Sequence, residues 1–304
     1  MADVPGPVVL AIGVFDGVHP GHRAVLQRAL DDARRTGATA VAATFHPHPA
    51  KILRPDHAPH LLTSLPHKRR LIADLGFEYL LVIPFTSTFA STPPRDFLKA
   101  LASACRPLSE IVVGCGWRFG KSRAGSVELI RAVGLEWGFE AVEIPSLEMD
   151  GAPVSSTRIR KAIQSGDLAT ARTLLGRPYS ILGTVVKGRQ LGRTLGFPTA
   201  NLRAHNEQFP PDGVYAVHAA FPDGSSRAGV ANIGVRPTLE SNGERTLEVH
   251  FPNFSGDLYT IDLEVTFLNF LRPEMRFANT EALKSQIALD IQDALKTPEA
   301  GSGP

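Results

Sequence analysis

Cysteine is scarce in this chain of 304 residues, which contains only Cys105 and Cys115. Two cysteines give no disulfide framework and no cysteine-based metal cluster, and they fit a reducing compartment. Long apolar runs are also missing, because prolines and glycines between residues 5 and 13 interrupt the apolar N-terminal stretch. No basic residue precedes that stretch. We therefore expect no signal peptide, no membrane span and a cytoplasmic location.

An excess of charge of one sign is absent as well, since 32 Lys and Arg face 30 Asp and Glu. Residues 1–179 carry 21 basic and 16 acidic side chains, and residues 180–304 carry 11 and 14. A mildly basic first half suits nucleotide phosphates but lacks the concentrated basic face that nucleic acid requires. We expect small-molecule partners, no nucleic acid, and a monomer or weak homo-oligomer.

Predicted strands and helices alternate in the first half of the chain. The pattern predicts strands at 8–12, 38–45, 79–84, 111–114 and 141–144, with helices from residue 22 and at 66–75, 94–103 and 126–134. This order is typical of a Rossmann-like α/β domain, a doubly wound parallel sheet that binds ligands at the carboxyl ends of its strands.

The pattern changes after residue 179. Short alternating runs separated by turns follow, at 180–186, 214–220, 228–233, 246–251 and 261–267. They predict a small antiparallel β-barrel or sandwich, closed by a helix at 280–295. We expect an α/β domain over residues 1–179 and a β domain over residues 180–304.

The most informative stretch of the first domain is AIGVFDGVHPGHRAVL, residues 11–26. Its glycine-rich turn places His19, Gly21 and His22 at a helix N-terminus, where backbone N–H groups and the helix dipole favour a phosphate. Two imidazoles there offer hydrogen bonds to phosphoryl oxygens, and Gly21 lets the backbone come close. The segment FDGVHPGH resembles the signature of the nucleotidyltransferase superfamily, whose members transfer a nucleotidyl group without a covalent intermediate.

A second candidate phosphate contact is VSSTRIRKAI, residues 154–163. Ser156 or a neighbouring hydroxyl can cap a helix, which is a purely structural role. However, Arg158 and Arg160 occupy the first turn, where cations oppose the helix dipole. Their position is easier to explain if they meet a phosphate.

The second domain contains GRQLGRTLGFPTAN, residues 188–201. Its glycines allow a backbone loop around phosphate. Thr199 and Asn201 point to one side of an extended segment, and their neutral oxygens suit a Mg²⁺ ion that already carries triphosphate oxygens. The pattern alone is equally compatible with an ordinary hairpin loop.

A carboxylate on a later strand strengthens the case for chemistry in this domain. Leu247, Val249 and Phe251 share one face of the predicted strand, whereas Glu248 and His250 share the other. A carboxylate facing a nucleotide site is a candidate general base for a substrate hydroxyl. The alternative is a solvated glutamate without a catalytic role.

Together these motifs resemble the prokaryotic bifunctional riboflavin kinase/FMN adenylyltransferases over nearly the whole chain, from Val8 to Ala294. Motifs of both domains occur in the family's order: FDGVHPGH, FHPHP, RFGKSRAG, SSTRIR, GRTLGFPTAN, GVYAV, NIGVRPT, LEVHF and LRPEMRF. The flavin comes from this resemblance alone, whereas the phosphate sites also follow from the residues themselves.

The resemblance implies that the barrel phosphorylates riboflavin with Mg-ATP. Glu248 would be the base, and Thr199 and Asn201 would bind Mg²⁺ and phosphate. Further contacts to ATP would come from Gly188, Gly192 and Arg193.

The resemblance also implies that the first domain joins FMN to the AMP part of a second ATP, which gives FAD and pyrophosphate. His19 and His22 would stabilise the charge of the α-phosphate. The remaining ATP and phosphate contacts would be Gly13, Phe15, Asp16, Gly21, Ser156, Arg158 and Arg160.

The chain departs from the family pattern at a few positions. Gly116 and Trp117 replace a usual Asp or Asn followed by Phe, and Ser126 and Asn253 each replace an Asp. Because residue 116 is expected beside the adenylyltransferase site, a riboflavin kinase with a degenerate first domain is an alternative. A flavin- or nucleotide-sensing protein without turnover is another, although such a protein has little use for a general base. An adenylyltransferase for another substrate, such as pantetheine phosphate, is disfavoured by the GRTLGFPTAN motif.

Overall fold

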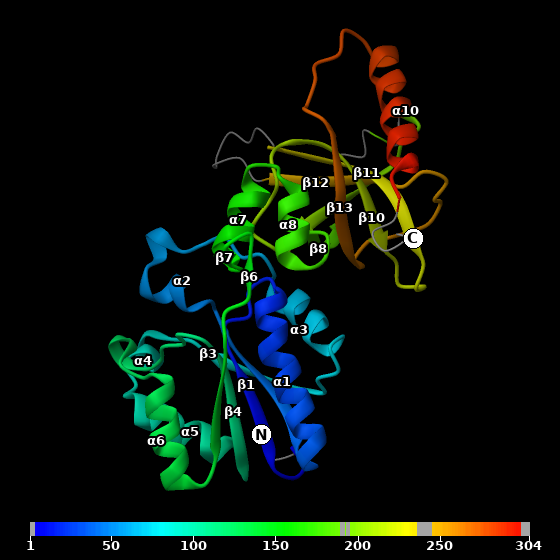
Figure 1. Ribbon diagram of the computed structural model, residues 1–304. Helices are drawn as coiled ribbons and strands as arrows, with labels where there is room; N and C mark the ends of the chain where they lie inside the picture. Colours follow the sequence, from blue (N-terminus) through cyan, green and yellow to red (C-terminus); the bar gives the residue numbers. More distant parts are fainter. Residues whose placement is uncertain (1–3, 189–191, 193–194, 236–244, 299–304) are drawn as a thin grey trace. The chain divides into compact units, whose positions relative to one another are not determined.

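The computed structural model describes residues 4–188, 192, 195–235 and 245–298, and the chain divides into two compact units (Figure 1). The first unit contains Met1–His60 and Leu65–Ser156, and the second contains Leu61–Ser64 and Thr157–Pro304. The predicted boundary lies later, between residues 179 and 180. The assignment of one reaction to each side of that boundary remains a prediction.

A five-stranded parallel sheet in the order β3-β2-β1-β4-β5 forms the first unit. Its strands are β1 (Val8–Ile12), β2 (Thr39–His46), β3 (Tyr79–Pro84), β4 (Leu108–Gly114) and β5 (Glu140–Ile144). Its helices are α1 (Pro20–Thr36), α2 (Pro49–Leu53), α3 (Leu65–Ala73), α4 (Ser87–Ala90), α5 (Pro94–Ala104) and α6 (Val127–Trp137), with 3₁₀ turns η1 (Pro55–His57) and η2 (Lys121–Arg123). The short strands β6 (Glu148–Met149) and β7 (Ala152–Pro153) form a separate ribbon.

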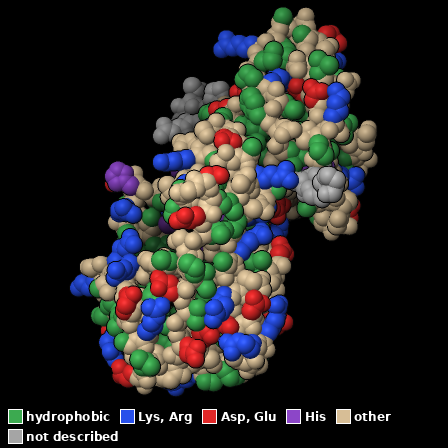
Figure 2. All heavy atoms as spheres, viewed as in Figure 1, with side chains coloured by type: hydrophobic (Ala, Val, Ile, Leu, Met, Phe, Trp, Pro, Cys, Tyr) green, Lys and Arg blue, Asp and Glu red, His purple; other side chains and the backbone are tan. Residues whose placement is uncertain are grey.

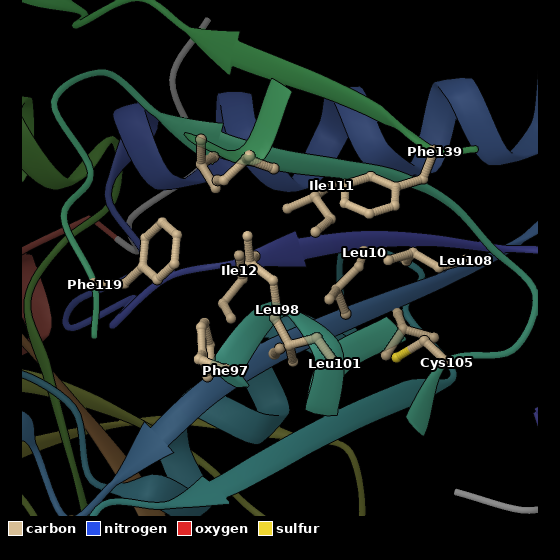
Figure 3. Packing of buried hydrophobic residues seen from close by; sticks show 14 of the residues in the cluster. Leu10, Ile12, Phe97, Leu98, Leu101, Cys105, Leu108, Ile111, Phe119 and Phe139 are labelled. Atoms are coloured by element: carbon tan, nitrogen blue, oxygen red, sulfur yellow. The ribbon is translucent and has the colours of Figure 1, made fainter. Parts of the chain in front are cut away.

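The central strand β1 explains why helices cover both faces of this sheet. All five of its residues are buried, and alternate side chains belong to different hydrophobic clusters. Leu10 and Ile12 share a cluster with residues of α5 and α6, and Figure 3 shows them beside Leu98 of α5. Val9 and Ala11 pack instead with residues of α1. The predicted doubly wound sheet is therefore confirmed.

The second unit contains a closed barrel in the order β10-β11-β12-β9-β8-β13. Its strands are β8 (Ser180–Val186), β9 (Thr199–Ala204), β10 (Gly213–Ala220), β11 (Ser226–Val235), β12 (Arg245–His250) and β13 (Asp262–Arg272). Its helices are α7 (Ser156–Gln164), α8 (Leu168–Leu175) and α10 (Thr280–Lys296). Ile291 and Ala294 of α10 pack against Val214, Ala216 and Val230 of the barrel. The predicted barrel and C-terminal helix are confirmed.

The segment Leu61–Ser64 was not predicted to leave the first unit. Its Leu61 carbonyl accepts hydrogen bonds from the backbone N–H groups of Glu207 (3.2 Å) and Gln208 (3.0 Å). The Glu207 carboxylate accepts the Leu61 N–H at 3.2 Å. These contacts pair the segment with the connection between β9 and β10.

Charged side chains of both signs are interspersed on the face that Figure 2 shows. Among the described residues, no helix combines the length and the apolar character needed to cross a membrane.

Candidate active sites

The turn between β1 and α1 has an unfavourable backbone conformation. Phe15 and Val18 have φ angles of 51° and 42°, in a region that residues with a Cβ rarely adopt, above all β-branched ones. Both side chains are buried, with 1% and 0% of their surface exposed. Gly13, at the start of this turn, donates its N–H to the carbonyl of Ala43 at 3.1 Å. Such conformations persist where the surrounding structure enforces them, and they are concentrated at functional sites.

The two histidines of this turn lie side by side at the start of α1. His19 is the N-cap residue, and its Nδ1 accepts the backbone N–H of His22 at 3.3 Å. Their rings stack with centroids 3.6 Å apart, and Phe15 meets the His22 ring edge-on at 5.5 Å. A Cβ on Gly21 would lie 3.2 Å from Cε1 of His19, so glycine leaves room for the stack. Both imidazoles are therefore held where the helix dipole favours an anion.

Hydrogen bonding and burial fix the protonation of these rings. Because Nδ1 of His19 accepts a hydrogen bond, its Nε2 carries the proton and is a donor in the neutral ring. Burial holds the pKa of His22 well below its ordinary value, and the charge that His19 would carry when protonated and the charge of Lys68 lower that pKa further. His22 is thus neutral near pH 7, and its buried Nδ1 has no hydrogen-bond partner among the described residues. The pair offers neutral donors to a phosphoryl oxygen.

Ser156 is joined to the same turn. Its hydroxyl donates to the backbone carbonyl of Asp16 at 2.9 Å, and Asp16 is only 2% exposed. Arg158 and Arg160 follow on α7, which belongs to the second unit from residue 157 onward. Their contact with phosphate remains a prediction.

The structure shows the surroundings of three positions that depart from the family pattern. Gly116 has a φ of 69°, and open space surrounds the position of a Cβ, so Asn or Asp would fit there. Its N–H donates to Oε1 of Glu143 at 3.1 Å. Trp117 stacks on Phe119 with ring centroids 4.7 Å apart. Ser126 precedes α6 as its N-cap residue without a side-chain capping bond.

In the barrel, Glu248 lies between two asparagines on neighbouring strands. It is paired in register with Asn201 of β9 and with Asn232 of β11. Directly opposed residues of antiparallel strands point to the same face of the sheet. Leu247 and Val249 point the other way and are buried, at 1% and 0% exposed. Glu248, Asn201 and Asn232 therefore form a polar group on the outer face of the barrel.

The two described ends of the β8–β9 connection lie close to this polar group. A Cβ on Gly188 would lie 2.4 Å from the side chain of Asn201, which explains the glycine. Nδ1 of His250 lies 2.8 Å from the carbonyl of Pro198 and thus steadies the segment that begins β9. Thr199 is paired with His250 in register. Gly192 belongs to the same connection, whereas Arg193 lies outside the described residues.

The chemistry of these side chains fits Mg²⁺ accompanied by triphosphate. The Thr199 hydroxyl and the Asn201 amide offer oxygen ligands on one face of β9, and Glu248 is paired with Asn201 on the neighbouring strand. Mg²⁺ favours oxygen ligands and usually needs few from the protein, because water and phosphate supply the rest. In the described part of the chain, no three His, Cys, Asp or Glu side chains gather into a group that could hold a metal ion by themselves.

Sequence reasoning missed three residues near these sites: Asn232, Glu274 and Lys68. Glu274 accepts a hydrogen bond from the Asn232 amide at 3.2 Å and thereby fixes the asparagine beside Glu248. Asn232 lies in the motif NIGVRPT and Glu274 in LRPEMRF, and neither motif indicated that the two residues are in contact. Lys68 is buried beside the β1–α1 turn, but in the sequence it resembles any lysine of a basic helix.

Comparisons with known proteins match a different family to each part of the chain. The FAD synthetase family matches residues 2–158, and the riboflavin kinase family matches residues 175–297. The bifunctional riboflavin kinase/FMN adenylyltransferase of Escherichia coli K12 is 39% identical over 93% of this chain and 90% of its own length. The Pseudomonas fluorescens protein of the same name is 38% identical over 96% and 94%. The chain belongs to the bifunctional riboflavin kinase/FMN adenylyltransferase family.

A solved structure extends the family's fold over the whole chain. A crystal structure described as a macrolide-efflux protein from Streptococcus pneumoniae is 29% identical, with a TM-score of 0.83 over 98% of this chain and 97% of that one. The predicted family and the presence of both enzymatic domains are confirmed. The matched ranges leave residues 159–174, most of α7 and α8, between the riboflavin kinase and FAD synthetase regions.

Proposed function

We propose that this chain makes FAD in two steps: the barrel phosphorylates riboflavin to FMN, and the sheet unit adenylylates FMN. ATP is the second substrate of each step. The observation that carries the proposal is that one chain presents both a carboxylate flanked by Asn201 and Asn232 and a stacked histidine pair at a helix N-terminus. The two sites differ in chemistry, as the two reactions require.

In the kinase reaction, Glu248 accepts the proton of the ribityl 5′-hydroxyl while that oxygen attacks the γ-phosphorus of ATP and ADP leaves. Asn201 and Asn232 flank Glu248 on the two neighbouring strands. Thr199 and Asn201 would hold Mg²⁺, which neutralises charge on the phosphate oxygens. The backbone around Gly188, Gly192 and Arg193 contacts the phosphates of ATP.

In the adenylyltransferase reaction, the phosphate of FMN attacks the α-phosphorus of ATP, and pyrophosphate leaves. FMN phosphate is already deprotonated, so the step needs charge stabilisation rather than a general base. His19 and His22 donate hydrogen bonds to the α-phosphoryl oxygens, in line with their neutral, fixed rings. Gly13, Phe15, Asp16 and Gly21 shape the ATP site, and Ser156, Arg158 and Arg160 contact phosphate.

Both reactions consume ATP and use small, water-soluble substrates, so we place the protein in the cytoplasm. We also propose that it is a monomer or weak homo-oligomer. One observation favours a second candidate, a riboflavin kinase whose first domain is inactive. Gly116 presents only backbone where the family usually has an Asp or Asn side chain.

Reciprocal variants test the assignment of the two sites. Glu248→Gln should abolish FMN formation from riboflavin and leave FAD formation from supplied FMN unchanged. His22→Ala should have the opposite effect, with an expected loss of about 100-fold in FAD formation. Glu281→Gln and His57→Ala change exposed residues of the same types and should alter neither reaction. A single variant that abolishes both reactions would contradict the two-site assignment.

A further inference from the structure

Lys68 is a buried cation that neither reaction has yet explained. It lies on α3 and is 6% exposed. Its ammonium group donates to the backbone carbonyl of Val14 at 2.7 Å and to Oγ1 of Thr44 at 3.3 Å. The Thr44 hydroxyl donates to the same carbonyl at 2.9 Å. One backbone oxygen thus accepts two hydrogen bonds, from a helix and from a strand.

The Val14 carbonyl that Lys68 contacts lies at the start of the turn that carries the two histidines. Val14 directly precedes Phe15, the first of the two residues with a strained backbone before α1. Such a residue is destabilising by itself and keeps its conformation only if neighbours enforce it. Lys68 and Thr44 provide that enforcement at the start of the turn, where they cross-link it to α3 and β2.

The charge of Lys68 also acts on the groups around the turn. Burial lowers the pKa of Lys68 to about 8, against the opposing effect of the Asp16 carboxylate. The Lys68 charge in turn lowers the pKa of His22, alongside burial and His19. Because burying an ammonium group is costly and Thr44 alone would satisfy the carbonyl, the positive charge needs a reason of its own.

We propose that Lys68 is a positioning residue of the adenylyltransferase site: its ammonium group holds the Val14–Val18 turn in the form that presents His19 and His22 to the α-phosphate. The inference rests on the proposed function of this turn. It predicts that loss of the ammonium lowers the rate of the chemical step while ATP binding changes little.

The test compares Lys68→Met, Thr44→Val and the exposed-residue control Lys99→Met. FAD formation from FMN and ATP is followed well below the melting temperature, and riboflavin phosphorylation by the same protein reports folding. Lys68→Met should lower kcat for FAD formation about tenfold or more, with KM for ATP and the kinase rate within about twofold of wild type. Thr44→Val, which keeps the ammonium, should have a smaller effect, and Lys99→Met none.

A pH profile separates a positioning role from simple packing. Wild-type FAD formation should fall above about pH 8 as Lys68 loses its proton, and Lys68→Met should lack this alkaline decline. An unchanged kcat in Lys68→Met, an unchanged alkaline decline, or equal loss of both reactions would overturn the inference. If wild type makes no FAD, the proposed function itself fails, which is distinguishable from a failure confined to Lys68.

Discussion

At the scale of single residues, a buried carboxylate pair makes the first unit sensitive to pH. Glu110 of β4 and Asp32 of α1 are each 5% exposed. Arg28 and Arg35 form ion pairs with Asp32. Burial, and secondly the neighbouring Asp32 charge, raise the pKa of Glu110 to about 7. The folded protein therefore binds this proton more tightly than the unfolded chain, in which Glu110 titrates near 4.5.

This pair predicts how stability depends on pH. The free energy of unfolding should fall as pH rises from about 4.5 to 7, because the folded state must then ionise a buried group. Glu110→Gln removes that penalty and should stabilise the protein by about 3 kcal/mol at pH 8, with little effect at pH 4.5. Thermal melting at both pH values, with exposed Glu78→Gln as control, checks this. Equal effects of Glu110→Gln at the two pH values would contradict it.

The sequence predicted site residues where a chemically suitable side chain also occupies a recognisable position in a strand or helix pattern. The alternation around Glu248 identified its polar face, and the spacing of His19 and His22 placed them at a helix N-terminus. Lys68 could not be found in this way, because its partners Val14 and Thr44 come from distant segments. Contacts set by tertiary packing leave no periodic signal in the chain.

At the scale of elements, the turn after β1 carries one candidate site, and the adjacent strands β9, β12 and β11 carry the other. The strands and helices that support them follow periodic patterns, so most were predicted to within a few residues. The sequence did not predict that Leu61–Ser64 belongs to the second unit. This placement depends on backbone hydrogen bonds with Glu207 and Gln208 rather than on composition. The compact division at Ser156 likewise follows from packing, whereas the change of pattern occurs near residue 179.

The β8–β9 connection yields a prediction of its own. A methyl group at Gly188 would lie 2.4 Å from the Asn201 side chain and displace it from Glu248. Gly188→Ala should therefore lower riboflavin phosphorylation about tenfold or more and leave FAD formation from FMN unchanged. Gly224→Ala, at a turn with a φ of 81° and open space around it, is a control that strains the backbone without touching Asn201, and it should retain kinase activity. A fully active Gly188→Ala variant would show that Asn201 need not occupy this position.

At the scale of the whole molecule, two folds with different chemistry occur in one chain. The parallel sheet presents a helix N-terminus with neutral histidines, suited to charge stabilisation at an α-phosphate. The barrel presents a carboxylate between asparagines, suited to activating a hydroxyl. The order of motifs predicted this combination, whereas the division of the chain at Ser156 depends on packing that no motif encodes.

The most direct test is a time course with purified protein, riboflavin and Mg-ATP in which FMN and FAD are separated chromatographically. We expect FMN to appear first and FAD to follow at its expense, which would also show that Gly116 is compatible with adenylyl transfer. Accumulation of FMN without FAD, even when FMN is supplied directly, would contradict the account of the first unit. Absence of both products would contradict the proposal as a whole.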